Sequence, residues 1–218
     1  MIDTPATTLS AARHFGAGKL SASASNRGDR SMPTKSAISS SAEWLRLREI
    51  IKEKSFRKDR VYTLSSGEQS GYYFDMKPTT FNSEGLSLTC EIMYDLVSGR
   101  RGVYVGGLAV GAVPIVSGLV LYSATRVPIM GFCVREEIKN HGTQQLIEGF
   151  IEDGANIIII DDVTTKGSSA MRAVEAVRQR KCKVIKVITI VDRLEGAFEM
   201  FNREGLEFVS IFTTKDFV

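Results

Sequence analysis

From residue 43 onward, apolar residues follow two patterns, helical spacing in some segments and short continuous runs in others. Trp44, Leu47 and Ile51 fall on one helical face, and Ser41 ahead of them is a favourable N-cap residue, so an amphipathic helix is predicted here. The same reasoning predicts helices over residues 86–97, 113–122 and 169–178. Continuous apolar runs predict strands over residues 103–105, 129–134, 157–160, 184–191 and 208–212.

The predicted strands are uniformly apolar, which indicates that both faces of their sheet are covered. Helices alternate with these strands, so the pattern predicts an α/β fold with a mostly parallel central sheet and flanking helices. Ligands in such folds bind at the carboxyl ends of the strands. Two shorter β-favouring runs, residues 61–64 and 72–76, flank a connection rich in Ser and Gly and predict a separate hairpin.

The first 41 residues differ from the rest in being rich in Ser and Ala and poor in large apolar side chains. Such a segment cannot bury enough surface to offset its ordering entropy, so a disordered leader is predicted, followed by one domain over residues 42–218. Two other interpretations stay open. The scattered arginines also resemble an organelle transit peptide, and Met32 is an alternative start of translation.

Charge and cysteine content exclude several classes of protein. Of 28 basic and 25 acidic residues, five basic and two acidic ones precede residue 43, which leaves 23 of each in the folded body and argues against a nucleic-acid partner. The three cysteines lack CxxC spacing, so neither a disulfide framework nor a zinc site is expected, and a reducing cytoplasm fits best. No apolar run reaches the roughly 18 residues of a membrane span.

The strongest chemical signal lies in residues 156–170, where an apolar run ends in Asp161 and Asp162 and a loop of Thr, Gly and Ser opens a helix. Backbone N–H groups and hydroxyls of such a loop suit a phosphomonoester, and the two acids suit the hydroxyls of an attached sugar. Solvated acids beside a capped helix are the alternative explanation. Neither GxxxxGK[ST] nor GxGxxG after a strand occurs, which disfavours P-loop and dinucleotide sites.

This segment resembles the motif by which type I phosphoribosyltransferases bind 5-phosphoribosyl 1-pyrophosphate (PRPP). Three further segments resemble those of orotate phosphoribosyltransferases. Residues 132–143, followed by 146–149, resemble the mobile catalytic loop. Residues 63–74 resemble the hood hairpin over the base, and residues 191–196 resemble the strand-end Asp-Arg that meets orotate.

The resemblance implies a type I phosphoribosyltransferase fold with a small N-terminal hood over residues of about 43–80. It implies transfer of the 5-phosphoribosyl group from PRPP to orotate in pyrimidine synthesis, with Mg²⁺ carried by PRPP and no metal ligand in the protein. It also implies a homodimer whose catalytic loop reaches the partner's site. By position, the expected catalytic residues are Asp161, Asp162, Arg135, Lys139 and His141. The expected PRPP-binding residues are Arg135, Lys139, His141, Asp161, Asp162, Val163, Thr164, Thr165, Lys166, Gly167, Ser168 and Ser169, and the expected orotate-binding residues are Tyr73, Phe74, Thr165 and Arg193.

The chain departs from the family pattern at Glu136 and Glu68, which place negative charge where basic residues are usual. Lys77 and Lys166 are candidates to compensate. The departures keep open a non-catalytic ribonucleotide-binding or regulatory relative. A phosphoribosyltransferase for another base, such as a purine, is the other alternative, and the hood hairpin and Arg193 disfavour it. Without the resemblance, Arg193 is equally well explained as an ion pair with Asp192 or Glu195.

Overall fold

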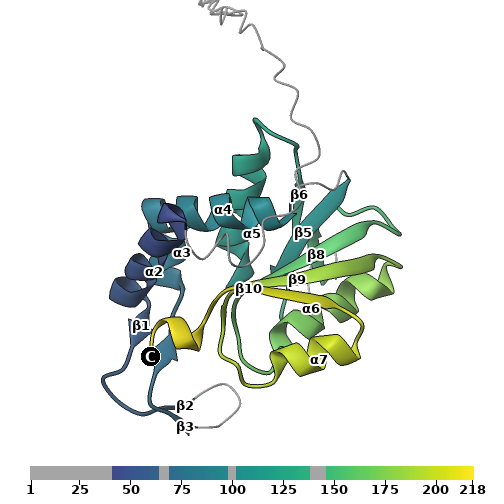
Figure 1. The fold of residues 1–218 in the computed structure, drawn as a ribbon. Coiled ribbons are helices and arrows are strands. Elements are labelled where there is room, and N and C mark those ends of the chain that lie inside the picture. Colours follow the sequence, from purple (N-terminus) through teal and green to yellow (C-terminus); the bar gives the residue numbers. More distant parts are fainter. Residues whose placement is uncertain (1–40, 64–68, 98–101, 138–145) are drawn as a thin grey trace, which may run out of the picture. The chain divides into compact units, whose positions relative to one another are not determined.

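The computed structural model describes residues 41–63, 69–97, 102–137 and 146–218 (Figure 1). The predicted leader therefore lies outside the described residues, apart from Ser41. The helices are α2 (Ala42–Lys54), α3 (Lys77–Thr80), α4 (Ser83–Val97), α5 (Ala112–Ser123), α6 (Ser168–Gln179), α7 (Ala197–Arg203) and the 3₁₀ turn η1 (Thr214–Asp216). The strands are β1 (Phe56–Arg57), β2 (Tyr62–Thr63), β3 (Gln69–Ser70), β4 (Tyr73–Phe74), β5 (Val103–Leu108), β6 (Met130–Val134), β7 (Ile147–Gly149), β8 (Asn156–Thr164), β9 (Lys183–Asp192) and β10 (Glu207–Thr213).

The central sheet has the strand order β10-β9-β8-β5-β6-β7. Every pair in it is parallel except β6 and β7, which run antiparallel at one edge. The four isoleucines of β8 show why this sheet is covered on both sides. Ile158 and Ile160 belong to one apolar cluster and Ile157 and Ile159 to the other, and all four are buried. The predicted mostly parallel sheet is confirmed.

Helices cover the two faces of the sheet as separate layers (Figure 1). The cluster on one face takes its helical residues from α2, α4 and α5, and the cluster on the other face takes them from α6 and α7. Trp44 of α2 also donates its indole N–H to the carbonyl of Ile211 in β10 (3.0 Å), which ties this helix to an edge strand of the sheet. As predicted, the Ser41 hydroxyl caps α2 by accepting from the backbone N–H of Trp44 (3.1 Å).

The predicted hairpin between residues 61–64 and 72–76 is wrong in its pairing. β4 pairs with β1, Phe74 opposite Phe56, while β2 pairs with β3, Thr63 opposite Gln69. Each of these strands has two residues, too few to show a period in the sequence, so pairing is decided by packing. Phe74 is buried, and its ring lies 5.0 Å from that of Phe56 and 5.2 Å from that of Phe217, which draws β4 toward β1.

Several elements were absent from the sequence prediction or were predicted too short. The helices α3 and α7 and the strand β7 span four, seven and three residues, below the length at which periodicity is readable. β8 continues beyond Ile160 to Thr164, so Asp161 and Asp162 lie within the strand, not after its end.

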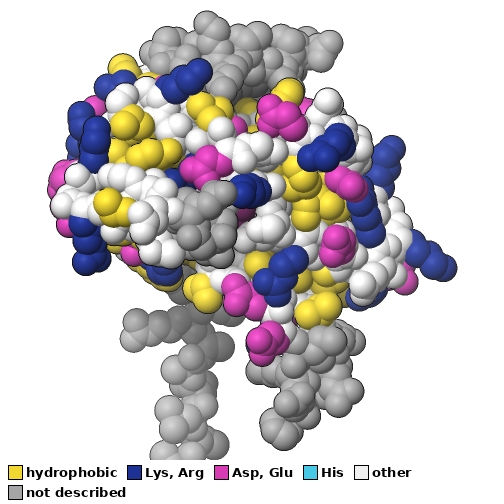
Figure 2. Space-filling model, turned by 90° about the horizontal axis from the view of Figure 1, so that it is seen from below, with side chains coloured by type: hydrophobic (Ala, Val, Ile, Leu, Met, Phe, Trp, Pro, Cys, Tyr) yellow, Lys and Arg dark blue, Asp and Glu magenta, His cyan; other side chains and the backbone are white. Residues whose placement is uncertain are grey.

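On the face seen from below in Figure 2, Lys and Arg side chains lie among Asp and Glu side chains, and no large area carries charge of one sign only.

Candidate active site

A polar cavity of about 250 Å³ opens at the carboxyl ends of β8 and β9, on the side that faces the small N-terminal strands. The register of the sheet creates it. Thr164 at the end of β8 pairs with Asp192 at the end of β9, and the N–H of Arg193 donates to the carbonyl of Thr164 (2.9 Å). The loops that follow these two strands therefore leave the sheet at one level. The lining residues are Thr63, Tyr73, Phe74, Asp75, Met76, Lys77, Asp161, Asp162, Val163, Thr164, Thr165, Gly167, Ser168, Ser169 and Arg193.

Two adjacent carboxylates form the floor of this cavity. Asp161 is 5% exposed and accepts a hydrogen bond from the Thr164 hydroxyl (2.9 Å), and Asp162 accepts from the N–H of Val163 (2.8 Å). Burial, and then the neighbouring charge of Asp162, raises the pKa of Asp161 to about 7. Burial also raises the pKa of Asp162, against which the Val163 N–H and the charge of Lys77 act. Both carboxylates would gain from a ligand that donates hydrogen bonds or carries positive charge.

The loop between β8 and α6 supplies backbone N–H groups to the same cavity. Gly167 takes φ +85°, a conformation that favours glycine, and serves as the N-cap of α6 without a side-chain cap. A Cβ at Gly167 would also collide with Met200 and Phe201 of α7, so the loop is held against the helix behind it. Gly167, Ser168 and Ser169 all line the cavity, so the N-terminal end of α6, with its dipole and first N–H groups, lies at the cavity wall, an arrangement that suits a phosphate.

The N-terminal strands supply the opposite wall. Tyr73 is 36% exposed and stacks on Tyr62 with ring centroids 5.3 Å apart and an interplanar angle of 19°. Beyond it, the Lys77 ammonium pairs with Asp75 at 2.9 Å, and this hydrogen bond raises the pKa of Lys77. Since its side chain is 56% exposed and lines the cavity, Lys77 is a cation within reach of an anionic ligand.

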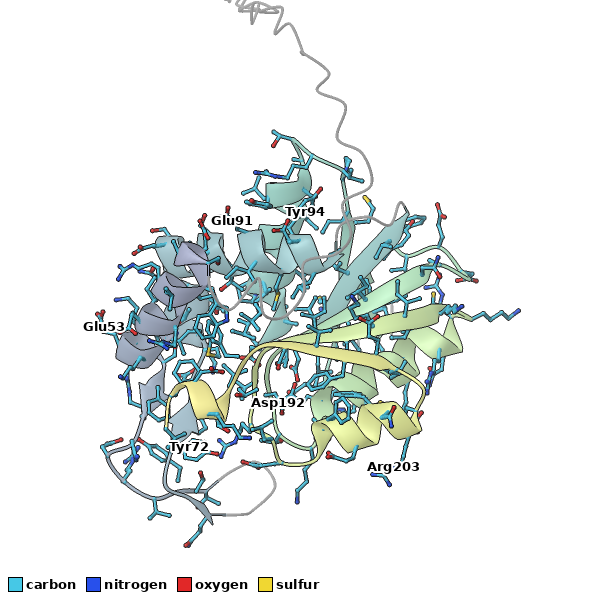
Figure 3. All side chains as sticks on the ribbon, in the orientation of Figure 1. Glu53, Tyr72, Glu91, Tyr94, Asp192 and Arg203 are labelled. Carbon is cyan, nitrogen blue, oxygen red and sulfur yellow. The ribbon has the colours of Figure 1, made fainter. Side chains whose placement is uncertain are left out.

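Arg193 comes from the turn after β9 and lines the cavity although its side chain is only 3% exposed. Its Nε donates to Glu195 (2.7 Å) and its Nη2 to the hydroxyl of Ser70 in β3 (3.0 Å). The guanidinium also lies over the ring of Tyr72, with Cζ 4.6 Å from the centroid. Figure 3 labels Tyr72, which lies between β3 and β4, and Asp192 at the end of β9. Of the two ion-pair partners considered from the sequence, Glu195 contacts the guanidinium.

The expected catalytic loop is described only at its two ends. Arg135 does not line the cavity; it pairs with Glu148 (2.6 Å) where β6 and β7 run side by side. The carbonyl of Glu136 accepts a hydrogen bond from Arg172 of α6, which connects the start of the loop to the helix behind the phosphate loop. Lys139, His141 and Glu68 lie outside the described residues.

Most of the other expected site residues line the cavity. All four proposed orotate-binding residues line the cavity, as do Asp161 to Thr165 and Gly167 to Ser169, whereas Lys166 does not. The sequence interpretation missed Thr63, Asp75 and Met76, and it gave no role to Gly111. A Cβ on Gly111 would lie 2.7 Å from Oδ1 of Asp162, so this glycine leaves the space that the carboxylate fills. In the sequence, the position of Gly111 just before a predicted helix is the one signal that could have indicated this role.

Comparisons with known proteins agree with this geometry. The family model described as "Phosphoribosyl transferase domain" matches residues 91–203. The orotate phosphoribosyltransferase of Bradyrhizobium sp. strain ORS 278 is 41% identical over 186 residues, covering 83% of this chain and 100% of the relative. That of Aquifex aeolicus is 40% identical over 170 residues, covering 77% and 93%.

Solved structures give the same result. The crystal structure of Mycobacterium tuberculosis orotate phosphoribosyltransferase with Fe(III) dicitrate has a TM-score of 0.70 and 34% identity, covering 80% of this chain and 98% of that one. The structure of the same enzyme in complex with PRPP has a TM-score of 0.67 and 31% identity, with the same coverage.

Proposed function

The chain belongs to the orotate phosphoribosyltransferase family, whose reaction takes the 5-phosphoribosyl group from PRPP to orotate, and we propose that the cavity at the ends of β8 and β9 is where this happens. The products are orotidine 5′-phosphate and pyrophosphate. One observation carries the assignment to this cavity. The carboxylates of Asp161 and Asp162, the glycine turn at the N-terminus of α6 and the guanidinium of Arg193 all line it, and they come from three different segments.

The carboxylates suit the ribose of PRPP. We assign Asp161 and Asp162 the role of accepting hydrogen bonds from the ribose hydroxyls. The Thr164 hydroxyl holds the Asp161 carboxylate in place, and the Val163 N–H holds that of Asp162. Positive charge develops on the ribose as its bond to pyrophosphate breaks. Two carboxylates in a buried site stabilise that charge more strongly than they would in water. Their negative charge thus favours the transition state over the bound substrate.

We assign the 5-phosphate of PRPP and the orotate ring to different parts of the cavity. We place the 5-phosphate at the loop from Thr164 to Ser169, where the α6 dipole and N–H groups favour an anion. We place the orotate ring against Tyr73 and Phe74, with Thr165 and Arg193 as the polar partners of its edge. The pyrophosphate then falls toward the loop that begins at Arg135.

Leaving-group stabilisation is assigned to Arg135, Lys139 and His141 by their match to the family's loop. Cationic side chains would offset the charge that accumulates on the pyrophosphate, and His141 is a candidate proton donor. In the structure Arg135 is bound to Glu148, so this role requires Arg135 to exchange that carboxylate for pyrophosphate. Lys77, which lines the cavity, is a further cation on the PRPP side.

The cavity chemistry fits a magnesium-bound substrate. Mg²⁺ prefers oxygen ligands and commonly binds through substrate phosphates and one or two carboxylates. Asp161 and Asp162 offer carboxylate oxygens as ligands. Burial raises the pKa of both, so positive charge beside them is favourable. When bound, Mg²⁺ would neutralise charge on the pyrophosphate of PRPP. Among the residues described, no group of three or more His, Cys, Asp or Glu side chains forms a metal site.

The direct test is the decrease in orotate absorbance with purified full-length protein, PRPP and Mg²⁺. We expect turnover with orotate and none with adenine or hypoxanthine in place of orotate. A Glu136→Lys variant, which restores the basic residue usual in the family, is expected to lower the Michaelis constant for PRPP.

A second candidate, a ribonucleotide binder without turnover, is favoured by one observation, the acidic Glu136 at the start of the loop. Nucleotide binding without orotate consumption in the wild type, with activity appearing in Glu136→Lys, would support the binder and contradict the enzyme.

We also propose a homodimer that forms over a groove of about 470 Å³ between α5, β6 and β7. Val116, Val120 and Phe132 line it, and Met130 at its edge is 51% exposed. Cys133 and Glu148, which pair with each other in the two strands that flank the catalytic loop, line the same groove. We therefore place the partner on this side. A second copy would cover the exposed apolar residues.

Sedimentation should show a dimer, and Met130→Glu should shift it toward monomer by burying a charge in the interface. The matched control is Phe198→Glu, at an apolar residue of α7 that is 58% exposed and outside the groove, which should stay dimeric. A fully active monomeric wild type would contradict the proposal.

In the described ranges, which omit residues 1–40 and three internal segments, no helix is long and apolar enough to cross a bilayer. The cytoplasmic placement stays a proposal that rests on the free cysteines.

A further inference from the structure

The guanidinium of Arg193 is fixed from two directions by segments far apart in the chain. Glu195, two residues further on, accepts from Nε at 2.7 Å. Ser70, 123 residues earlier, accepts from Nη2 at 3.0 Å, and Tyr72 lies against the flat face with its ring centroid 4.6 Å from Cζ. The two hydrogen bonds use Nε and Nη2, and Nη1 is the nitrogen that neither contact uses.

The guanidinium of Arg193 is buried, so its hydrogen-bond partners strongly affect its orientation. The Arg193 side chain is 3% exposed and that of Glu195 is 25% exposed, so their ion pair is shielded from water on the arginine side. A guanidinium has a rigid, planar set of donors, and one bond at Nε sets how the plane is rotated about the side-chain axis. The backbone is fixed as well, since the N–H of Arg193 donates to Thr164 and its carbonyl accepts from the Thr214 hydroxyl (3.3 Å).

We propose that Glu195 is a positioning residue for recognition of the carboxylate of orotate, acting through Arg193. By accepting from Nε, Glu195 holds the guanidinium so that the nitrogens it does not use face the cavity in a fixed plane. A planar carboxylate then meets donors that are already oriented, which lowers the entropy lost on binding. This inference rests on the proposed function, specifically on the assignment of Arg193 to orotate.

A purely electrostatic effect of Glu195 would have the opposite sign. The negative charge of Glu195 repels an incoming carboxylate, so its removal would tighten orotate binding if charge were the main effect. If positioning is the main effect, removal weakens orotate binding, and a neutral side chain that still accepts from Nε restores it. Glutamine supplies such an acceptor at the same distance along the side chain.

The experiment measures Michaelis constants for orotate and PRPP in Glu195→Ala, Glu195→Gln and the control Glu199→Ala, which replaces an exposed glutamate on α7. We expect Glu195→Ala to raise the Michaelis constant for orotate about 10-fold, the loss typical of a charge-assisted hydrogen bond, and to leave that for PRPP unchanged. Glu195→Gln should recover most of the wild-type value, and Glu199→Ala should match the wild type. Ser70→Ala, which frees Nη2 from the other side, should shift orotate binding in the same direction.

Two outcomes overturn the inference. One is a lower Michaelis constant for orotate in both Glu195 variants, and the other is an unchanged constant in Glu195→Ala and Ser70→Ala. Arg193→Gln separates this failure from that of the proposed function. If Arg193→Gln weakens orotate binding and Glu195→Ala does not, only the positioning role is wrong. If Arg193→Gln leaves orotate binding unchanged, the placement of orotate itself is wrong. Should Glu195→Ala fail to fold, Glu195→Gln and Ser70→Ala decide the question.

Discussion

Replacing Asp161 or Asp162 by asparagine should lower the turnover number about 100-fold, because each change removes a negative charge from the cavity wall where we place the ribose. Asparagine has nearly the same shape as aspartate and keeps an oxygen acceptor, so substrate binding should change less than turnover. Steady-state kinetics with saturating PRPP and orotate measure the effect. Asp153→Asn, at a carboxylate that is 66% exposed and pairs with Arg180, is the matched control and should be fully active.

The same variants should be more stable than the wild type above neutral pH. Burial raises the pKa of Asp161 from 3.8 to about 7, so the folded chain holds this proton more tightly than the unfolded chain does. A carboxyl with a raised pKa contributes stability at low pH, and that contribution is lost as the pH rises through the folded value. The ligand-free wild type should therefore melt at a lower temperature at pH 8 than at pH 6.

In Asp161→Asn this pH dependence should shrink, because no proton is exchanged at that position. Thermal melts at the two pH values, without PRPP, measure it. Lower turnover together with a higher melting temperature at pH 8 would separate a catalytic role from a structural one. Unchanged turnover in both asparagine variants would contradict the assigned site.

Gly111→Ala should lower turnover about 10- to 100-fold although it touches no substrate. A Cβ at this position would lie 2.7 Å from Oδ1 and 2.8 Å from Cγ of Asp162, closer than carbon atoms approach, so the carboxylate must move. The backbone itself accepts alanine, since Gly111 has helical angles of φ −59° and ψ −43° ahead of α5. Displacing a catalytic group by about 1 Å is sufficient for a loss of this size.

A double-mutant cycle with Asp162→Asn tests the physical route of this effect. If Gly111→Ala acts by displacing the Asp162 carboxylate, it should add little to the loss already caused by Asp162→Asn. Additive losses would mean that Gly111 acts elsewhere, for example on the turn before α5. The melting temperature of Gly111→Ala should fall only slightly, because Gly111 has helical angles that alanine can adopt, although alanine is a poorer N-cap residue than glycine.

The sequence predicted the regular elements of the sheet and failed on the short ones. Ile157 to Ile160 form a continuous apolar run because β8 is buried on both faces, and that requirement is visible in the residues themselves. The pairing of Phe74 with Phe56 left no such trace. It depends on an aromatic cluster with Phe217, which is 143 residues later in the chain than Phe74.

In the candidate site, too, the sequence reveals contiguous residues but not contacts between distant ones. Asp161 to Ser169 are contiguous, and their chemistry follows from residue type and from the strand-loop-helix order, so a motif reveals them. Arg193 was identified by resemblance. Its partner Ser70 belongs to β3 and Tyr72 follows that strand, and the sequence does not fix how β3 pairs. Gly111 was missed, since a glycine before a helix has many explanations and only the position of Asp162 singles one out.

The sequence by itself determined the α/β class, the carboxylate pair, the loop to which we assign the 5-phosphate, and the family, because these depend on local periodicity and on contiguous motifs. Only the tertiary structure decided which side chains meet. It aligned Thr164 with Asp192 so that two loops face one cavity, placed Glu195 and Ser70 on either side of one guanidinium, and left room at Gly111 for a carboxylate. Such contacts join residues as much as 123 positions apart, and they are set by packing across the whole domain, which no local pattern encodes.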